Sequence, residues 1–237
     1  PQLVYPIASA LFLAVTVWGF RHFFFEGGAY PGRDITPPIR LLVILHGIAM
    51  SVWMLVAVVQ PWLVFAGRRK LHMAIGKGGA ALGAVLVALG VATAIMSARV
   101  TPPDATFGPL NPTQFLLVPL ASMLAFGVCL GVGVAKRRRP EVHRAAMFLA
   151  TLCLLPAALD RIDQVRDAYA PTLLYTLWGP FFSALVLGAG VLLVRSLWAR
   201  RPDRVLALGL AGLTAVFAIA YQIAKTDAWV RVASLVV

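Results

Sequence analysis

Histidine is the residue type in this chain best suited to hold a cofactor or move a proton. His22 follows the first apolar run, and His46 lies about six residues into the second. His72 and His143 each open a later apolar run. An imidazole titrates near neutral pH and binds transition metals through two distinct nitrogens. Because an ionisable ring in an apolar segment is costly unless it is paired, these residues are the first candidates for function.

The composition shows what kind of element must position these histidines. The 237 residues are 60% hydrophobic and only 13% charged, with a mean hydropathy of +0.85, which excludes an ordinary soluble protein. The 21 Lys and Arg outnumber the 9 Asp and Glu, giving a net charge of +12. These basic residues fall between apolar runs, where they indicate which loops lie on the cytoplasmic side of a membrane. We therefore expect a lipid bilayer as partner and no nucleic acid.

Seven apolar segments reach the length that a membrane span requires, about 20 residues at a rise of about 1.5 Å each. The fold class predicted is all-α, a polytopic membrane helix bundle in one domain over residues 1–237, with its core motifs in 41–165. The fifth segment contains Pro156, which predicts a kink or a wetter continuation past Asp160. The predicted helices are about 4–24, 41–66, 72–97, 115–135, 143–165, 173–194 and 205–224.

Clusters of Lys and Arg occupy alternate loops of this arrangement. By the positive-inside rule these loops are cytoplasmic, so the N-terminus lies inside and the C-terminus outside. Topology, with some attraction to anionic lipid, is the simplest role for such runs. The three clusters are Arg68, Arg69, Lys70 and Lys77; Lys136 to Arg139 with Arg144; and Arg195, Arg200, Arg201 and Arg204.

This topology places two histidines near each side of the bilayer. One metal cannot bind all four, because the 20 residues from His46 to Ala66 span about 30 Å of helix. His72 and His143 form a possible inner pair, and His46 and His22 a possible outer pair. Two imidazoles from facing helices commonly hold a b-type haem as axial ligands. We therefore predict haem b at His72 and His143, with a second site at His46.

Each histidine also has a purely structural interpretation. His22 ends its segment among aromatic residues, where an amphipathic ring contacts lipid headgroups. The ring of His46, about 9 Å below the outer boundary by the helix rise, either functions or makes a structural hydrogen bond. His72 and His143 at helix starts could likewise serve only backbone carbonyls.

Three other polar residues are candidates within or beside the apolar segments. Gln60 precedes Pro61 in the second segment, where it could bond a neighbouring helix, a quinone or freed backbone. Asp160 and Arg161 end the fifth segment. They either begin a polar helical extension in water or form an outer polar site together with His46.

Several enzyme templates are missing from the sequence. It contains no Gly-rich phosphate loop, no Gly-x-Ser-x-Gly elbow, no Cys-x-x-Cys and no His-Glu-x-x-His. Whether the chain is an enzyme stays open at this point.

A set of short motifs between Leu45 and Ile162, about half of the chain, resembles a group of bacterial membrane proteins of unknown function, the domain-of-unknown-function 2306 group. Met73 departs from the arginine usual in that group. The resemblance implies a membrane domain with intramembrane histidines in the bacterial inner membrane, similar in layout to the cytochrome b561 class. The motifs are Leu45-His46-Gly47, Gln60, Leu71-His72-Met73-Ala74-Ile75-Gly76, His143-Arg144-Ala145-Ala146-Met147 and Arg161.

Three functional hypotheses follow. The leading one is an inner-membrane protein that binds haem b through His72 and His143 and passes electrons between a quinone and a partner. A second is a structural or assembly subunit of a larger respiratory or photosynthetic membrane complex. A third is a small-molecule or proton carrier that uses His46, Gln60 and Asp160.

Overall fold

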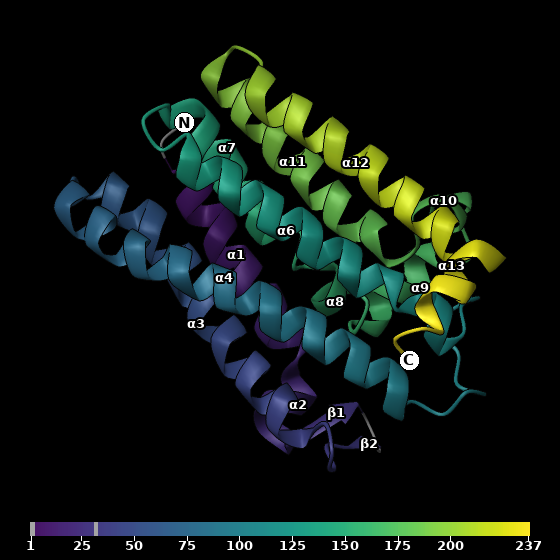
Figure 1. Cartoon of the computed structure of the whole chain (residues 1–237). Helices are drawn as coiled ribbons and strands as arrows, with labels where there is room; N and C mark the ends of the chain where they lie inside the picture. Colours follow the sequence, from purple (N-terminus) through teal and green to yellow (C-terminus); the bar gives the residue numbers. More distant parts are fainter. Residues whose placement is uncertain (1–2, 31–32) are drawn as a thin grey trace.

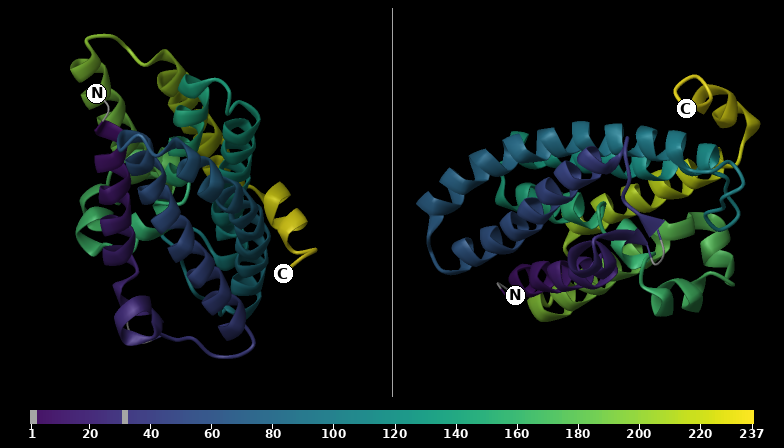
Figure 2. Two further views of the ribbon diagram at one scale, coloured as in Figure 1. Left: turned by 90° about the vertical axis from the view of Figure 1, so that its left-hand side faces the viewer. Right: turned by 90° about the horizontal axis from the view of Figure 1, so that it is seen from below.

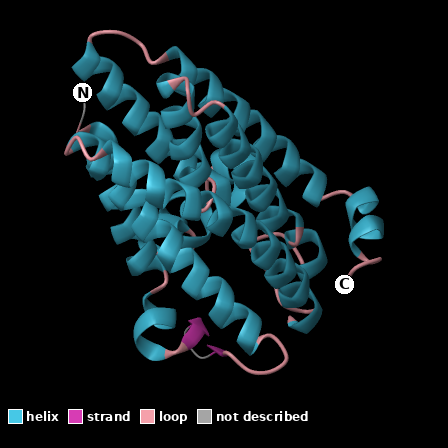
Figure 3. Ribbon diagram, turned by 60° about the vertical axis from the view of Figure 1, so that its left-hand side comes forward, coloured by secondary structure: helices cyan, strands magenta, loops and turns pink. Residues whose placement is uncertain are grey.

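The apolar segments form the long helices of the computed structural model, which describes residues 3–30 and 33–237. Within these residues, six helical stretches are long and apolar enough to cross a membrane, and a shorter apolar helix precedes them. The prediction of an all-α bundle is confirmed, with one small strand pair added in a loop (Figure 3). The elements are α1 (Val4–Gly19), α2 (Arg21–Glu26), β1 (Gly28–Tyr30), β2 (Arg33–Asp34), α3 (Arg40–Phe65), α4 (Arg69–Val100), α5 (Pro112–Phe115), α6 (Leu117–Ala135), α7 (Pro140–Leu152), α8 (Pro156–Leu159), α9 (Asp163–Tyr169), α10 (Leu173–Trp178), the 3-10 helix η1 (Gly179–Phe181), α11 (Phe182–Ala199), α12 (Arg204–Ala224) and α13 (Asp227–Ala233).

The helices pack in an order that follows the chain (Figure 1). α3 pairs with α4, α4 with α6, and α6 with α7, while α12 covers α6 and α7. α1 lies against α3 and α8. In the span formed by α7 and α8, 72% of the most apolar window is buried, against 17% in α3. α7 and α8 are therefore central, and most of α3 presents apolar side chains outward, as expected in lipid.

The first predicted helix, 4–24, is wrong at its end, because α1 stops at Gly19 and α2 is a separate helix. A Cβ on Gly19 would lie 2.2 Å from the backbone oxygen of Ala158, so only glycine permits this approach of α1 to α8. The chain leaves helical geometry at Phe20 (φ −100°, ψ 22°). In Figure 2 α2 turns away from the axis of α1.

The fifth segment breaks at Pro156, as the sequence predicts. α7 ends at Leu152 and α8 starts at Pro156, whose ring nitrogen cannot donate to the preceding turn. The predicted continuation of one helix to residue 165 is wrong. Ile162 is extended (φ −93°, ψ 103°), and α9 begins as a new helix at Asp163.

The two chain ends lie at opposite ends of the bundle (Figures 1 and 2). The end that holds the start of α1 also holds the loops between α3 and α4, α6 and α7, and α11 and α12, which carry the basic clusters. We call it the inner end. The outer end carries the β1–β2 hairpin, α9 and α13, where the Trp229 indole donates to the Thr113 carbonyl at 3.1 Å.

Candidate functional site

The structure brings His72 and His143 together at the inner end. His72 lies in the first turn of α4, just after the basic loop, and His143 in the first turn of α7, which Pro140 begins. Their ring centroids are 6.1 Å apart and their planes stand at 88°. Both rings are half-buried. The inner pair predicted from the sequence is thus a real juxtaposition of two imidazoles from different helices.

Backbone carbonyls orient both rings. Nδ1 of His143 donates to the Gly133 carbonyl at 2.8 Å, and Nδ1 of His72 donates to the Gln60 carbonyl at 3.3 Å. A carbonyl oxygen has no hydrogen to give, so Nδ1 carries the proton in each neutral ring. The lone pair of each ring is therefore on Nε2, the arrangement common to metal-ligating histidines.

The Gln60 side chain joins this inner cluster from α3. Its Nε2 would lie 3.7 Å from a Cβ on Gly76, one helical turn along α4 from His72. Both amide atoms are buried and neither has a hydrogen-bond partner. A buried amide without hydrogen bonds is costly in an apolar interior. The Gln60 amide is therefore available to form a hydrogen bond with a polar group of a bound ligand.

His46 occupies a separate position in the outer half of α3. Its Cε1 lies 3.5 Å from where a Cβ on Gly90 would stand, and Met123 of α6 crowds the same glycine. Its Nδ1 is buried without a hydrogen-bond partner. The structure therefore places this ring in a tight junction of α3, α4 and α6.

His22 pairs with an acidic residue of its own helix. Its Nδ1 lies 2.7 Å from Oε2 of Glu26, one turn further along α2, while its Nε2 is buried without a hydrogen-bond partner. The neighbouring Phe23 packs on α3, its ring 2.6 Å from where a Cβ on Gly47 would stand. Within residues 3–30 and 33–237, Nε2 of His22 and Nδ1 of His46 are both buried without a hydrogen-bond partner, and the outer histidine pair stays a prediction.

Asp160 and Arg161 lie just after the span that ends at Leu159, and they face different neighbours. The Asp160 carboxyl interacts with the phenol of Tyr169, yet its Oδ1 is buried without a hydrogen-bond partner. Burial raises the pKa of this carboxyl, and nearby guanidinium groups only partly oppose the shift. Arg161 donates to the Ala157 carbonyl at 2.6 Å and covers the Phe20 ring at 4.7 Å. These contacts of Asp160 and Arg161 are with α8, α9 and Phe20, and the outer site that would join them to His46 stays a prediction.

Sequence reasoning missed two polar clusters. The first surrounds Asp160 at the outer end. The rings of Tyr169 and Tyr175 lie near each other there, with centroids 5.5 Å apart, and the rings of Tyr175 and Tyr221 lie 6.2 Å apart. The second cluster, at the inner end, joins Tyr5, Arg144, Arg195 and Asp203. Its members are up to 198 residues apart in sequence, so no local spacing could reveal it.

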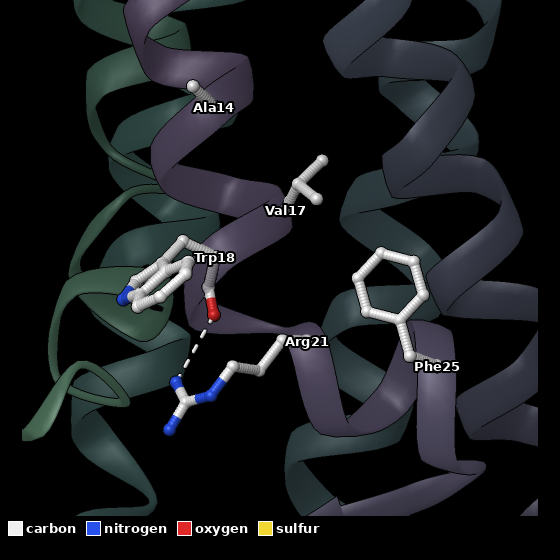
Figure 4. A pocket seen from close by; sticks show the side chains of 5 residues that line it. All are labelled: Ala14, Val17, Trp18, Arg21 and Phe25. Atoms are coloured by element: carbon white, nitrogen blue, oxygen red, sulfur yellow. Dashed lines mark hydrogen bonds between the residues drawn. The ribbon is translucent and has the colours of Figure 1, made fainter.

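An apolar groove lies on the outer half of α1 and α2 (Figure 4). Arg21 closes one side by donating to the Trp18 carbonyl at 3.3 Å. The groove contains none of the residues singled out from the sequence. It is lined by Ala14, Val17, Trp18, Arg21 and Phe25.

Comparison of the chain with protein-family models, with curated proteins and with solved structures finds no match. The membrane helix bundle is therefore established by the helices themselves. In the part of the chain that the structure describes, no three His, Cys, Asp or Glu side chains lie close enough to hold a metal ion.

Proposed function

We propose that this chain is a membrane electron-transfer protein that holds a haem b through His72 and His143. The observation that carries the proposal is the 6.1 Å spacing of two imidazoles whose Nδ1 atoms are both anchored to backbone carbonyls. The Nδ1 bonds leave the lone pair of each ring on Nε2, and neutral imidazole nitrogens from two helices are the donors that would hold a haem b. The residues therefore fit the group in donor type and tautomer.

The number of ligands favours haem over a bare metal ion. A structural zinc ion takes four protein ligands and a catalytic one takes three, whereas only two are gathered here. A porphyrin supplies the remaining nitrogens itself and needs only two axial imidazoles. A bound haem b would supply one-electron chemistry at the inner end of the bundle.

Gln60 supports a quinone as the electron donor or acceptor. A quinone headgroup has two carbonyl oxygens, and the buried Gln60 amide offers unpaired donors beside His72. The position, in a helix that faces lipid, suits a lipid-soluble substrate. The carrier hypothesis is less well supported, because His46, Gln60 and Asp160 lie at three separate places.

A visible spectrum of the protein purified from haem-replete cells tests the proposal. We expect a Soret band, and reduced-minus-oxidised bands of a b-type haem, in the wild type and in the control His22→Ala, which removes a histidine of α2 outside the inner pair. We expect His72→Ala and His143→Ala each to lose most of the haem, because even the loss of a residue that only supports a metal ligand typically costs about 10- to 100-fold in affinity, and here the ligand itself is removed.

Two results would contradict this proposal. One is a colourless, monodisperse wild-type protein, which would favour a structural subunit or a carrier. The other is equal haem content in His72→Ala, His143→Ala and His22→Ala, which would remove the axial pair. Thermal unfolding of each variant checks that a loss of haem is not a loss of fold.

A further inference from the structure

Four polar side chains from different elements meet at the inner end of the bundle. Two guanidinium groups lie close to the ring of Tyr5 of α1, with Cζ of Arg144 at 5.3 Å and Cζ of Arg195 at 5.1 Å from its centroid. Asp203, which caps α12, pairs with Arg195 and lies 3.5 Å from the Tyr5 hydroxyl. Figure 1 shows the starts of α1 and α7 beside the α11–α12 loop at this end.

Both oxygens of the Asp203 carboxylate already accept hydrogen bonds from the protein. One oxygen of Asp203 accepts from Nε of Arg195, and the other accepts from the Leu206 backbone N–H at 3.1 Å. Burial alone would raise the pKa of Asp203, but these bonds and the nearby charge of Arg144 hold it below its ordinary value. Asp203 is therefore ionised at neutral pH, and the cluster holds two positive charges and one negative charge.

Asp203 forms its salt bridge with Arg195, and its charge acts on Arg144 only from a distance. The Nε of Arg144 is buried and has no hydrogen-bond partner, and the ring of Tyr5 holds the guanidinium by its face. A charge near membrane depth is normally paired, and a planar guanidinium matches the oxygens of a phosphate group. The cluster lies at the end of the bundle that carries the basic loops. Basic pockets between helices at the cytoplasmic face bind the phosphate groups of lipid headgroups.

We propose that Arg144 and Arg195, held by Tyr5, form a binding site for a phosphate group, supplied by an anionic phospholipid of the inner leaflet or by free phosphate. The phosphate oxygens accept from the guanidinium N–H groups of Arg144 and Arg195 and supply the negative charge that Asp203 does not. The site does not depend on haem, since none of these side chains is a haem ligand in the proposed function.

Native mass spectrometry of protein exchanged into mixed micelles of phosphatidylglycerol and phosphatidylcholine tests the site. We expect retained phosphatidylglycerol in the wild type and at least about 10-fold less in Arg144→Gln, because a hydrogen bond to a charged group is lost. Arg138→Gln is the matched control: it removes an exposed arginine from the loop at the same end and should retain the lipid.

Asp203→Asn gives a result that simple unfolding cannot mimic. Asn caps a helix about as well as Asp, so α12 keeps its cap while Arg195 loses its competing carboxylate. We expect this variant to retain more phosphatidylglycerol than the wild type. If it loses the lipid as Arg144→Gln does, the cluster is only a packing network and the proposal is overturned.

Inorganic phosphate distinguishes the two sources. Phosphatidylglycerol that resists millimolar phosphate assigns the site to the lipid. A thermal stabilisation by phosphate alone, present in the wild type and absent in Arg144→Gln, assigns it to the free ion. Equal phosphatidylglycerol in wild type and Arg144→Gln, with no phosphate effect, would refute the site under either source.

Discussion

The Asp160 carboxyl should make the protein less stable as the pH rises, which is opposite to the usual behaviour of an aspartate. Burial raises its folded-state pKa above the ordinary value of an aspartate, although Arg161 and Arg166 oppose the shift. The folded state therefore binds more protons than the unfolded state between these two pKa values. The free energy of unfolding must then fall with pH across that window and stay low above it.

The size of this effect follows from linkage. A pKa difference of one unit between the folded and unfolded states corresponds to about 1.4 kcal/mol. For a chain of this length, 1 kcal/mol moves the unfolding midpoint by about 2–4 °C. Asp160→Asn keeps the shape of the side chain and removes the titration. We therefore expect the midpoint of the variant to rise relative to that of the wild type as the pH increases above about 4, the ordinary pKa of an aspartate, and the difference then to stay constant at higher pH.

Thermal unfolding in detergent at a series of pH values measures that difference. Subtracting the two midpoints at each pH cancels the other titrating groups. Asp163→Asn is the matched control, since Asp163 is an exposed carboxylate paired with Arg21 and Arg166 and should show no such gain. A difference between wild type and Asp160→Asn that does not change as the pH increases above about 4, or that favours the wild type as pH rises, would refute the buried-carboxyl argument.

Three further outcomes are expected. Gly19→Ala should lose about 1–3 kcal/mol in thermal unfolding, because its Cβ would meet a backbone oxygen at 2.2 Å, whereas Gly131→Ala, with nothing within 4 Å, should be neutral. Gln60→Leu should keep the haem spectrum but slow reduction by a quinol analogue about 10-fold in stopped-flow absorbance, since a hydrogen bond is lost; an unchanged rate would remove Gln60 from the quinone site. Single cysteines at Arg138 and Asp104 in intact cells should react with an impermeant thiol reagent only at position 104, and the reverse pattern would invert the topology.

The long helices could be predicted because lipid imposes a simple rule on sequence. Each span needs about 20 apolar residues, and each break in the apolar pattern sits near a proline or a basic loop. Pro156 predicts the break between α7 and α8 correctly. The end of α1 could not be predicted, since Gly19 lies in an apolar stretch and its constraint is a contact with Ala158, 139 residues later in the chain.

The inner histidine pair could be predicted for the same reason. His72 and His143 both open helices after basic loops, so topology alone puts them at one depth. Depth does not determine neighbours at the outer end. The sequence leaves open whether Asp160 joins His46 in one outer site, and in the structure His46 lies beside Gly90 of α4 and Asp160 beside Tyr169 of α9.

The position of His46 limits how electrons could cross the bilayer. It lies 14 residues before Gln60 on α3, about 21 Å along the helix axis. His46 therefore cannot share a ligand position with the pair formed by His72 and His143. Its ring lies beside Gly90 of α4, the glycine at which Met123 of α6 also packs. Under the proposed function, the haem at His72 and His143 therefore exchanges electrons with a quinone and a partner that both reach the inner end.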